Sequence, residues 1–137
     1  MTQTAGIYCV DDEAWITKAL LFLLNSKLRG PEYHVEAYND PFEAEEGILD
    51  NAEHGIQPLI FIVDFQMPGM RGDEFVRKMK RAYPQTKIII LSGNSNVLLV
   101  SELEEESLMD YYISKPWSRD EFLTTLNSCL PLNLKFA

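Results

Sequence analysis

The sequence predicts a doubly wound α/β fold, in which five helices cover a parallel sheet of five strands. Two strand-like runs, residues 59–63 and 87–91, are almost wholly apolar, which is typical of strands that helices bury on both faces. Longer segments with apolar residues at helical spacing separate the strand-like runs, and this alternation favours a parallel sheet. Several runs also end abruptly on polar residues, as expected where an open sheet binds its ligand.

The length, composition and net charge of the chain fit one cytoplasmic domain. A chain of 137 residues that is 46% hydrophobic can bury one core, and we expect a domain over residues 1–131 and a tail or start of a linker over 132–137. With 12 basic and 21 acidic residues the net charge is −9, which disfavours direct binding to nucleic acid or to an anionic membrane. No signal-peptide pattern opens the chain, and no apolar run approaches the roughly 20 residues of a membrane span.

Four elements are expected in the first half of the chain. Apolar residues recur every three or four positions in the first helix, which ends before Gly30 and Pro31. The second strand alternates polar and apolar side chains, as a strand near the sheet edge does. Asp40 is the predicted N-cap of the second helix, with Pro41 in its first position. The four elements are a strand over residues 6–10, a helix over 14–28, a strand over 33–38 and a helix over 41–53.

The second half continues the alternation. After the strand that ends at Asp64, a helix has an apolar stripe on one side and four basic residues on the other, which we interpret as a solvated face in an acidic protein. Ser118 and Glu121 have the spacing of a capping box at the start of the last helix, which Pro131 ends. The stripe consists of Phe75, Val76, Met79, Ala82 and Tyr83, and the later elements are a strand over 87–91, a helix over about 96–107, a strand over 111–114 and a final helix.

Four other side chains are interpreted from their patterns. Cys9 and Cys129 lie on apolar faces without the spacing of a zinc site, so we expect two buried free thiols. Trp15 and Phe22 form a second apolar row on the first helix. The favoured interpretation is that this row packs against a neighbouring helix, and the alternative is a surface on which a partner docks.

Residues with carboxylate, hydroxyl or amine side chains lie at the ends of four of the predicted strands. Because the carboxyl ends of parallel strands share one edge of a sheet, these side chains should gather at one rim. Carboxylates about 5 Å apart repel by roughly 3 kcal/mol per pair at an effective dielectric constant near 20, so they require protons or a cation. Mg²⁺, which binds one or two carboxylates together with water and phosphate oxygens, is the expected cofactor. The rim residues are Asp11 and Asp12 after the first strand, Asp64 after the third, Ser92 after the fourth and Lys115 after the fifth.

This set of groups indicates phosphoryl transfer. A carboxylate beside Mg²⁺ can act as a nucleophile toward phosphorus and form an acyl phosphate. The Lys115 amine and the Ser92 hydroxyl would then lie around the phosphoryl oxygens, so catalysis would consist of positioning and charge neutralisation.

Four motifs at the strand ends point to one family. They are Val10-Asp11-Asp12-Glu13, Asp64 with Met67-Pro68-Gly69-Met70-Arg71-Gly72, Ser92-Gly93, and Lys115-Pro116-Trp117. Together they resemble the receiver domain of response regulators in two-component signalling, over essentially all 137 residues. The resemblance implies the flavodoxin-like strand order 2-1-3-4-5 and Asp64 as the phosphoacceptor. It also implies a Mg²⁺ site of Asp11, Asp12, Asp64 and the backbone carbonyl of Gln66.

The same resemblance implies roles for the rest of the rim. Ser92 and Lys115 would contact the phosphoryl group, Ser92 and Tyr112 would form the switch, and the Lys115–Pro116 peptide bond would be cis. A histidine kinase or histidine phosphotransfer protein would supply the phosphoryl group. Phosphorylation would change the surface of the fourth helix, fifth strand and fifth helix, and so control an output domain or partner protein. Such a domain is a phosphoprotein and not an enzyme, although it assists its own phosphorylation and dephosphorylation; a homodimer is left open.

Two further expectations concern individual features of this chain. Lys115-Pro116-Trp117 resembles receivers attached to phosphodiesterase domains of the HD-GYP type. Gln66 and Asn94, which flank the site in sequence, are expected to tune hydrolysis of the acyl phosphate by controlling the access of water.

Three other kinds of protein share some of these features with a phosphorylated receiver. A pseudo-receiver would keep the fold as an interaction module without phosphotransfer, but the acceptor set is intact here. Magnesium phosphatases that form an aspartyl-phosphate intermediate carry an Asp-x-Asp motif at their first strand. In this chain the lone acceptor, Asp64, lies at the end of the third strand instead. A flavodoxin requires a phosphate loop after the first strand, where Asp11, Asp12 and Glu13 would repel the ligand.

Overall fold

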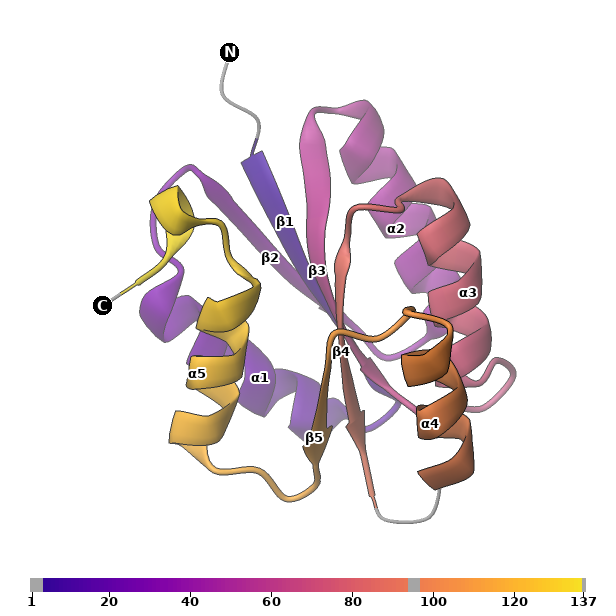
Figure 1. Ribbon diagram of the computed structural model, residues 1–137. Coiled ribbons are helices and arrows are strands. Elements are labelled where there is room, and N and C mark those ends of the chain that lie inside the picture. Colours follow the sequence, from indigo (N-terminus) through magenta and orange to yellow (C-terminus); the bar gives the residue numbers. More distant parts are fainter. Residues whose placement is uncertain (1–3, 94–96, 137) are drawn as a thin grey trace.

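Five parallel strands form the centre of the molecule, in the order β2-β1-β3-β4-β5. The computed structural model describes residues 4–93 and 97–136, and Figure 1 shows helices on both faces of the sheet. This arrangement confirms the predicted fold class and strand order. The strands are β1 Thr4–Val10, β2 Tyr33–Tyr38, β3 Ile56–Asp64, β4 Lys87–Ser92 and β5 Tyr111–Ser114; the helices are α1 Ala14–Lys27, α2 Pro41–Glu53, α3 Gly72–Ala82, α4 Val97–Glu105 and α5 Arg119–Cys129, followed by the short helix η1 Leu132–Leu134.

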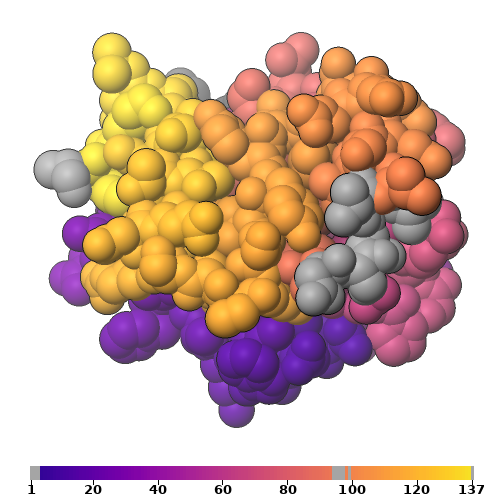
Figure 2. All heavy atoms as spheres, turned by 60° about the horizontal axis from the view of Figure 1, so that its bottom comes forward, coloured from indigo at the N-terminus to yellow at the C-terminus, as the bar shows by residue number. Residues whose placement is uncertain are grey.

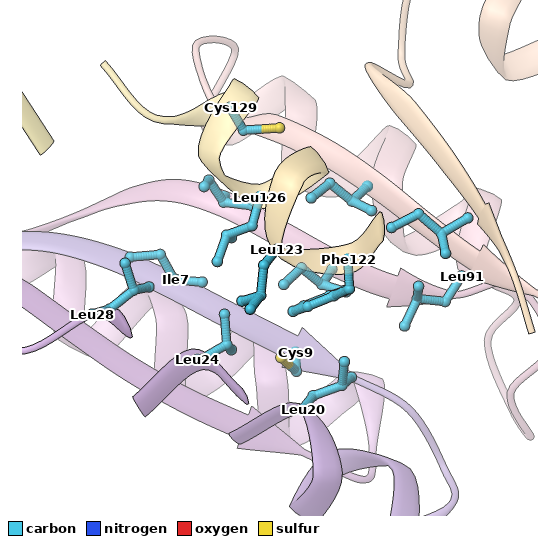
Figure 3. Packing of buried hydrophobic residues seen from close by; sticks show 14 of the residues in the cluster. Ile7, Cys9, Leu20, Leu24, Leu28, Leu91, Phe122, Leu123, Leu126 and Cys129 are labelled. Atoms are coloured by element: carbon cyan, nitrogen blue, oxygen red, sulfur yellow. The ribbon is translucent and has the colours of Figure 1, made fainter. Parts of the chain in front are cut away.

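The central strand β3 supplies both halves of the core. Its alternate side chains point to opposite faces, so Ile60 and Ile62 join the cluster under α1 and α5, whereas Phe61 and Val63 join the cluster under α2 and α3. Figure 3 shows the leucines of α1 together with Phe122 and the leucines of α5, gathered around Ile7 and Cys9 of β1. After the exposed Gln57 near its start, β3 carries no polar residue until it reaches Asp64 at the carboxyl edge of the sheet.

The helix termini follow the predicted signals. The Asp40 carboxylate accepts a hydrogen bond from the backbone N–H of Phe42 (2.9 Å), and the Ser118 hydroxyl accepts one from the N–H of Glu121 (3.0 Å). The predicted start of the fourth helix at Asn96 lies outside the described residues. That helix ends at Glu105 instead of Ser107, because Ser107 adopts a left-handed conformation with φ 58° that stops it.

The predictions that the second apolar row of α1 and Ala82 of α3 are buried are wrong, whereas the prediction of two buried cysteines is confirmed. Trp15 is 67% exposed and Phe22 is 71% exposed, so this row of α1 faces solvent and does not pack on a neighbouring helix. Ala82 is also exposed, since the buried stripe of α3 ends one turn earlier, at Met79. Cys9 and Cys129 are buried free thiols, as expected.

The tail packs back onto the domain. The side-chain amide of Asn127 on α5 accepts a hydrogen bond from the Phe136 N–H (2.9 Å) and donates one to the Phe136 carbonyl (3.0 Å). The Tyr33 hydroxyl of β2 donates to the Leu134 carbonyl at 2.6 Å. Leu134 and Phe136 pack against the core cluster of α1 and α5, where both are partly buried. Within residues 4–93 and 97–136, no helix is long and apolar enough to cross a membrane.

Gly72 lets the β3–α3 loop pass close to the acceptor strand. Its N–H donates to the carbonyl of Phe65 at 2.8 Å, and a Cβ atom there would lie 2.4 Å from the Asp64 carbonyl oxygen and 2.8 Å from the Phe65 Cα. Both neighbours are backbone atoms of a buried strand end, so they have little freedom to move. A side chain at this position would therefore displace the residue that ends β3.

We expect Gly72→Ala to lower the free energy of unfolding by about 1–3 kcal/mol, the usual cost of overpacking a well-packed site. Urea denaturation at pH 7 measures the effect. Gly93→Ala is the matched control, because a Cβ atom at Gly93 would meet no atom of the described residues within 4 Å. Equal stability losses in the two variants would contradict the close approach.

Candidate functional site

The predicted rim exists at the carboxyl edge of the sheet. Asp11 and Asp12 follow β1, and Asp64 ends the neighbouring strand β3. One carboxylate oxygen from each of these three residues lies within 4.8 Å of the others. Asp11 is fully buried and Asp64 is 5% exposed, whereas Asp12 is open to solvent. The site is therefore a carboxylate cluster with one accessible side.

Lys115 is the cation that the chain itself brings to this cluster. Its Nζ lies 2.9 Å from Oδ2 of Asp11 and 3.1 Å from Oδ1 of Asp64. The Lys115 N–H donates to the Ser92 carbonyl at 2.8 Å, which continues the pairing of β4 with β5 beyond the strand end. The peptide bond between Lys115 and Pro116 is cis, in agreement with the geometry that the resemblance implies.

Asp11 is fixed by neighbours on two sides. Its Oδ1 accepts a hydrogen bond from the Glu13 N–H at 2.9 Å, which leaves Oδ2 for Lys115. The side-chain amide of Asn39, just beyond β2, donates to the Asp11 carbonyl at 2.8 Å and to the Thr17 hydroxyl at 3.0 Å. Sequence reasoning missed Asn39, and its position directly after a strand was the only available signal.

The strand end and its loop hold Asp64. Beyond β3 the Phe65 N–H donates to the Leu91 carbonyl of β4 at 3.1 Å, so the chain stays attached to the sheet past the acceptor. Gly69 adopts a positive φ of 83°, which turns the loop back toward α3. Gln66 is exposed in this loop, two residues after Asp64, and the role of its carbonyl as a ligand stays a prediction.

Burial and the close approach of like and opposite charges shift the pKa values of the site residues. Desolvation and, after it, the charge of Asp11 raise the pKa of Asp64 to about 6, although Lys115 opposes the change. Desolvation also raises the pKa of Asp11, against the lowering effect of its hydrogen bonds with the Glu13 N–H and Lys115. Burial by itself lowers the pKa of Lys115, but its hydrogen bonds and charge interactions with Asp11 and Asp64 outweigh this, and the net change is upward.

The donor set fits a hard divalent cation. It consists only of carboxylate oxygens close enough to share one ion, with an open side at Asp12 where water or phosphate oxygens can complete the coordination. Histidine and cysteine, the ligands that favour softer metals, are absent from this described cluster. The residues are thus suited to Mg²⁺, with one lysine ammonium already offsetting part of the negative charge.

The remaining predicted residues lie on the β4 and β5 side of the rim. Ser92 ends β4 and is buried. Tyr112 is 38% exposed on β5, and its hydroxyl donates to the Gly93 carbonyl at 3.1 Å. Asn94, predicted to control water access, lies outside the described residues.

Comparison with known proteins now assigns the family. The model of the response regulator receiver domain matches residues 7–127, which include every predicted rim residue. The chain belongs to the response regulator receiver domain family. The resemblance found in the sequence motifs is thereby confirmed, and the chain is a signalling domain of two-component systems.

Relatives and solved structures agree with this assignment. The transcriptional regulatory protein FixJ of Bradyrhizobium diazoefficiens is 28% identical over 130 residues, which are 95% of this chain and 58% of FixJ. A response regulator receiver domain protein from Clostridium thermocellum has a TM-score of 0.74 at 25% identity, covering 91% of this chain and 93% of that one. The receiver domain of an HD domain-containing protein from Pseudomonas fluorescens Pf-5 has the same fold, with a TM-score of 0.77, 24% identity and coverage of 93% and 94%. This receiver spans little more than half of FixJ.

The raised pKa of Asp64 predicts that the stability difference between the wild type and Asp64→Asn depends on pH. Because the folded state holds this proton more tightly than the unfolded chain, ionising Asp64 costs stability as the pH rises from about 4 through about 6. In metal-free buffer at pH 7, Asp64→Asn should therefore be more stable than the wild type by about 1–2 kcal/mol, which is less than the full pKa shift implies because solvent reaches the cluster at Asp12.

Urea denaturation with a metal chelator, from pH 4 to pH 8, tests this prediction. The stability gap between Asp64→Asn and the wild type should close toward pH 4, where both carry a neutral side chain. Saturating Mg²⁺ should also narrow the gap at pH 7, because a cation bound to the folded state stabilises only the wild-type cluster in full. A gap that is constant over this pH range would contradict the shifted pKa.

Proposed function

We propose that this receiver accepts a phosphoryl group on Asp64, in a Mg²⁺-dependent reaction, from a histidine kinase or a histidine phosphotransfer protein. One observation carries the proposal: the Lys115 ammonium contacts Asp11 and Asp64 at the edge of a carboxylate cluster that includes Asp12. Membership of the family supports the same conclusion. An intact acceptor set of this kind is what a pseudo-receiver would lack.

In the proposed step, a carboxylate oxygen of Asp64 attacks the phosphorus of a phosphohistidine. The new bond is between phosphorus and the Asp64 oxygen, and the bond between phosphorus and the imidazole nitrogen breaks. The imidazole leaves with the electron pair and takes a proton from solvent, and Asp64 becomes an aspartyl phosphate. With a small acyl phosphate as donor, a phosphorus–oxygen bond breaks instead and a carboxylate leaves.

The residues around Asp64 have separate tasks in this proposal. Asp11, Asp12, Asp64 and the Gln66 carbonyl would hold Mg²⁺, which when bound neutralises charge on the phosphoryl oxygens. Lys115 already lies 3.1 Å from Asp64, so its ammonium would pass from the carboxylate to a phosphoryl oxygen as the product forms.

Ser92 and Tyr112 are proposed to change position when Asp64 is phosphorylated. The Ser92 hydroxyl would donate to the new phosphoryl oxygen, and Tyr112 would move inward after it. That movement would require the Tyr112 hydroxyl to leave the Gly93 carbonyl, to which it donates in this structure. The surface of α4, β5 and α5 would change as a result and control an output domain or a partner protein.

Several parts of the proposal concern the protein in the cell. We propose a cytoplasmic phosphoprotein that acts as a signalling domain and not as an enzyme on another substrate. FixJ is named a transcriptional regulatory protein, which makes a DNA-binding output one candidate elsewhere in such a protein. An HD-GYP output, expected from Lys115-Pro116-Trp117, stays a prediction, as does a homodimer.

Intact-mass measurement tests the central reaction. After incubation with Mg²⁺ and acetyl phosphate, the wild-type chain should gain the mass of one phosphoryl group. Asp64→Asn should gain none, because an amide oxygen is too weak a nucleophile for this displacement. Chelation of Mg²⁺ should also abolish the gain, since the carboxylates would then repel the anionic donor.

One further variant serves as a control for the mass measurement. Asp73→Asn replaces another buried aspartate that is not part of the cluster, and it should still gain a phosphoryl group. An equal gain in Asp64→Asn would place the modification elsewhere, and a metal-independent gain would contradict the Mg²⁺-dependent reaction. A chain that gains no phosphoryl group and binds no Mg²⁺ would be a pseudo-receiver.

A further inference from the structure

Helix α2 carries several acidic side chains and no lysine or arginine. Glu43, Glu46, Asp50 and Glu53 are all exposed, and they lie three or four residues apart along the helix. Residues at this spacing are neighbours on a helix surface, so these like charges repel one another. Asp50 and Glu53 also lie near the C-terminal end, where the helix dipole disfavours negative charge. A basic surface placed over α2 would relieve both effects.

Helix α3 lies beside α2 on the same face of the sheet (Figure 1). The Lys78 ammonium of α3 is 2.7 Å from the Glu45 carboxylate of α2, which identifies the flanks by which the two helices face each other. Leu49 and Ala82 lie one turn further along these flanks, and Phe42 lies two turns before Leu49. Leu49 is 54% exposed, Phe42 is 49% exposed and Ala82 is exposed too. The line between the two helices, called the midline below, is therefore apolar and open to solvent.

The outward side of α3 is basic. Arg77 contacts Glu106, which follows α4, whereas the exposed Arg81 has no carboxylate within 4 Å in the described part of the chain. Glu74, the exposed acid of α3, is already paired with Arg71 at 3.5 Å. The surface of the two helices thus has three zones: an acidic stripe on α2, the apolar midline and a basic side on α3. These zones together are called the α2–α3 face.

This order of zones is self-complementary under one symmetry operation. A two-fold axis along the midline, parallel to the helices, places α2 of one copy over α3 of the other, and the reverse contact follows by symmetry. Acids then meet bases on both sides of the axis, and the apolar residues nearest the axis meet their own counterparts. An axis across the helices would instead place the acidic stripe over itself. The charges therefore select one arrangement.

We propose that the α2–α3 face is the interface of a homodimer of this chain, with the two-fold axis along the midline. A different partner would have to supply both a basic and an acidic stripe at matching spacing, whereas a second copy carries both. Helices of 13 and 11 residues are about 16–20 Å long, so the face is at the small end of stable interfaces. The dimer is therefore reversible and forms at micromolar concentrations or above.

The dimer leaves the other side of the domain uncovered. Helices α1 and α5 pack on the opposite face of the sheet. Figure 2 shows the pink atoms around α3 at the right edge of the molecule, on the side away from the yellow atoms of α5. None of the rim carboxylates belongs to the α2–α3 face, so the dimer does not depend on the proposed phosphoryl transfer. Two receivers are thus brought together before phosphorylation, with α5 of each still free.

Charge reversal tests the interface by sedimentation velocity, from micromolar to submillimolar concentrations of the full chain. Glu46→Lys places a base opposite the basic side of α3, and Arg81→Glu places an acid opposite the acidic stripe, so each should weaken the dimer at least tenfold. An equimolar mixture of the two variants should regain the wild-type affinity, because one of its two contacts is native and the other has its charges exchanged. Leu49→Asp, which places two carboxylates beside the axis, should also weaken the dimer.

The design separates the interface from general effects of charge. Glu46→Lys and Arg81→Glu change the net charge in opposite directions, so net charge alone cannot weaken association in both. Lys18→Glu is the matched control for Arg81→Glu, since Lys18 is an exposed base on α1, and it should leave the dimer affinity unchanged. Unfolding curves show whether each variant is folded.

Three outcomes would overturn the dimer proposal. They are a wild type that stays monomeric over the whole concentration range, a dimer that both charge reversals leave intact, and a mixture that does not regain association. Phosphorylation of the variants by acetyl phosphate should equal that of the wild type, because Asp64 and its neighbours are unchanged. A dimer without phosphorylation would remove the proposed function alone, and phosphorylation without a dimer would remove this inference alone.

Discussion

The close approach of three carboxylates at one edge of the sheet is the constraint on which the rest of the site depends. Oxygens of Asp11, Asp12 and Asp64 lie within 4.8 Å of one another, and Asp11 and Asp64 are almost wholly removed from water. At this separation each ionised pair costs about 3 kcal/mol at an effective dielectric constant near 20. One ammonium, that of Lys115, offsets part of this cost, and the pKa of Asp64 stays raised at about 6. The site therefore favours binding of a further cation.

The fold supplies the rigidity that holds these charges together. Asp11 follows β1 and Asp64 ends the adjacent strand β3, and the side chains of both strands are buried on both faces of the sheet. Lys115 arrives from β5, two strands beyond β3, and it is held by the backbone hydrogen bond to Ser92. Gly72 allows the loop after Asp64 to fold closely against the strand end. Each of these contacts joins segments that only the tertiary structure brings together.

The sequence predicted most of the fold and the rim, because both follow from short-range rules. Apolar periodicity located every strand, and the chain topology then required residues at the strand ends, such as Asp11, Asp64 and Lys115, to meet. Exposure of Trp15 and Phe22 could not be predicted, since α1 is apolar on two sides and periodicity does not say which side meets the sheet. The contacts of Asn39 with Asp11 and Thr17 depend on tertiary geometry alone and leave no periodic signal.

The ionisation of Asp64 is the property that tests this account most directly. Carboxyl carbon chemical shifts of ¹³C-labelled aspartate, assigned by comparison with Asp64→Asn, give its pKa during a pH titration. We expect a pKa near 6 without metal and a clear decrease in saturating Mg²⁺, because the cation replaces protons in the cluster. A pKa near the ordinary aspartate value of about 3.9 that Mg²⁺ does not change would contradict the account. Such a result would mean that the three carboxylates do not act as one site.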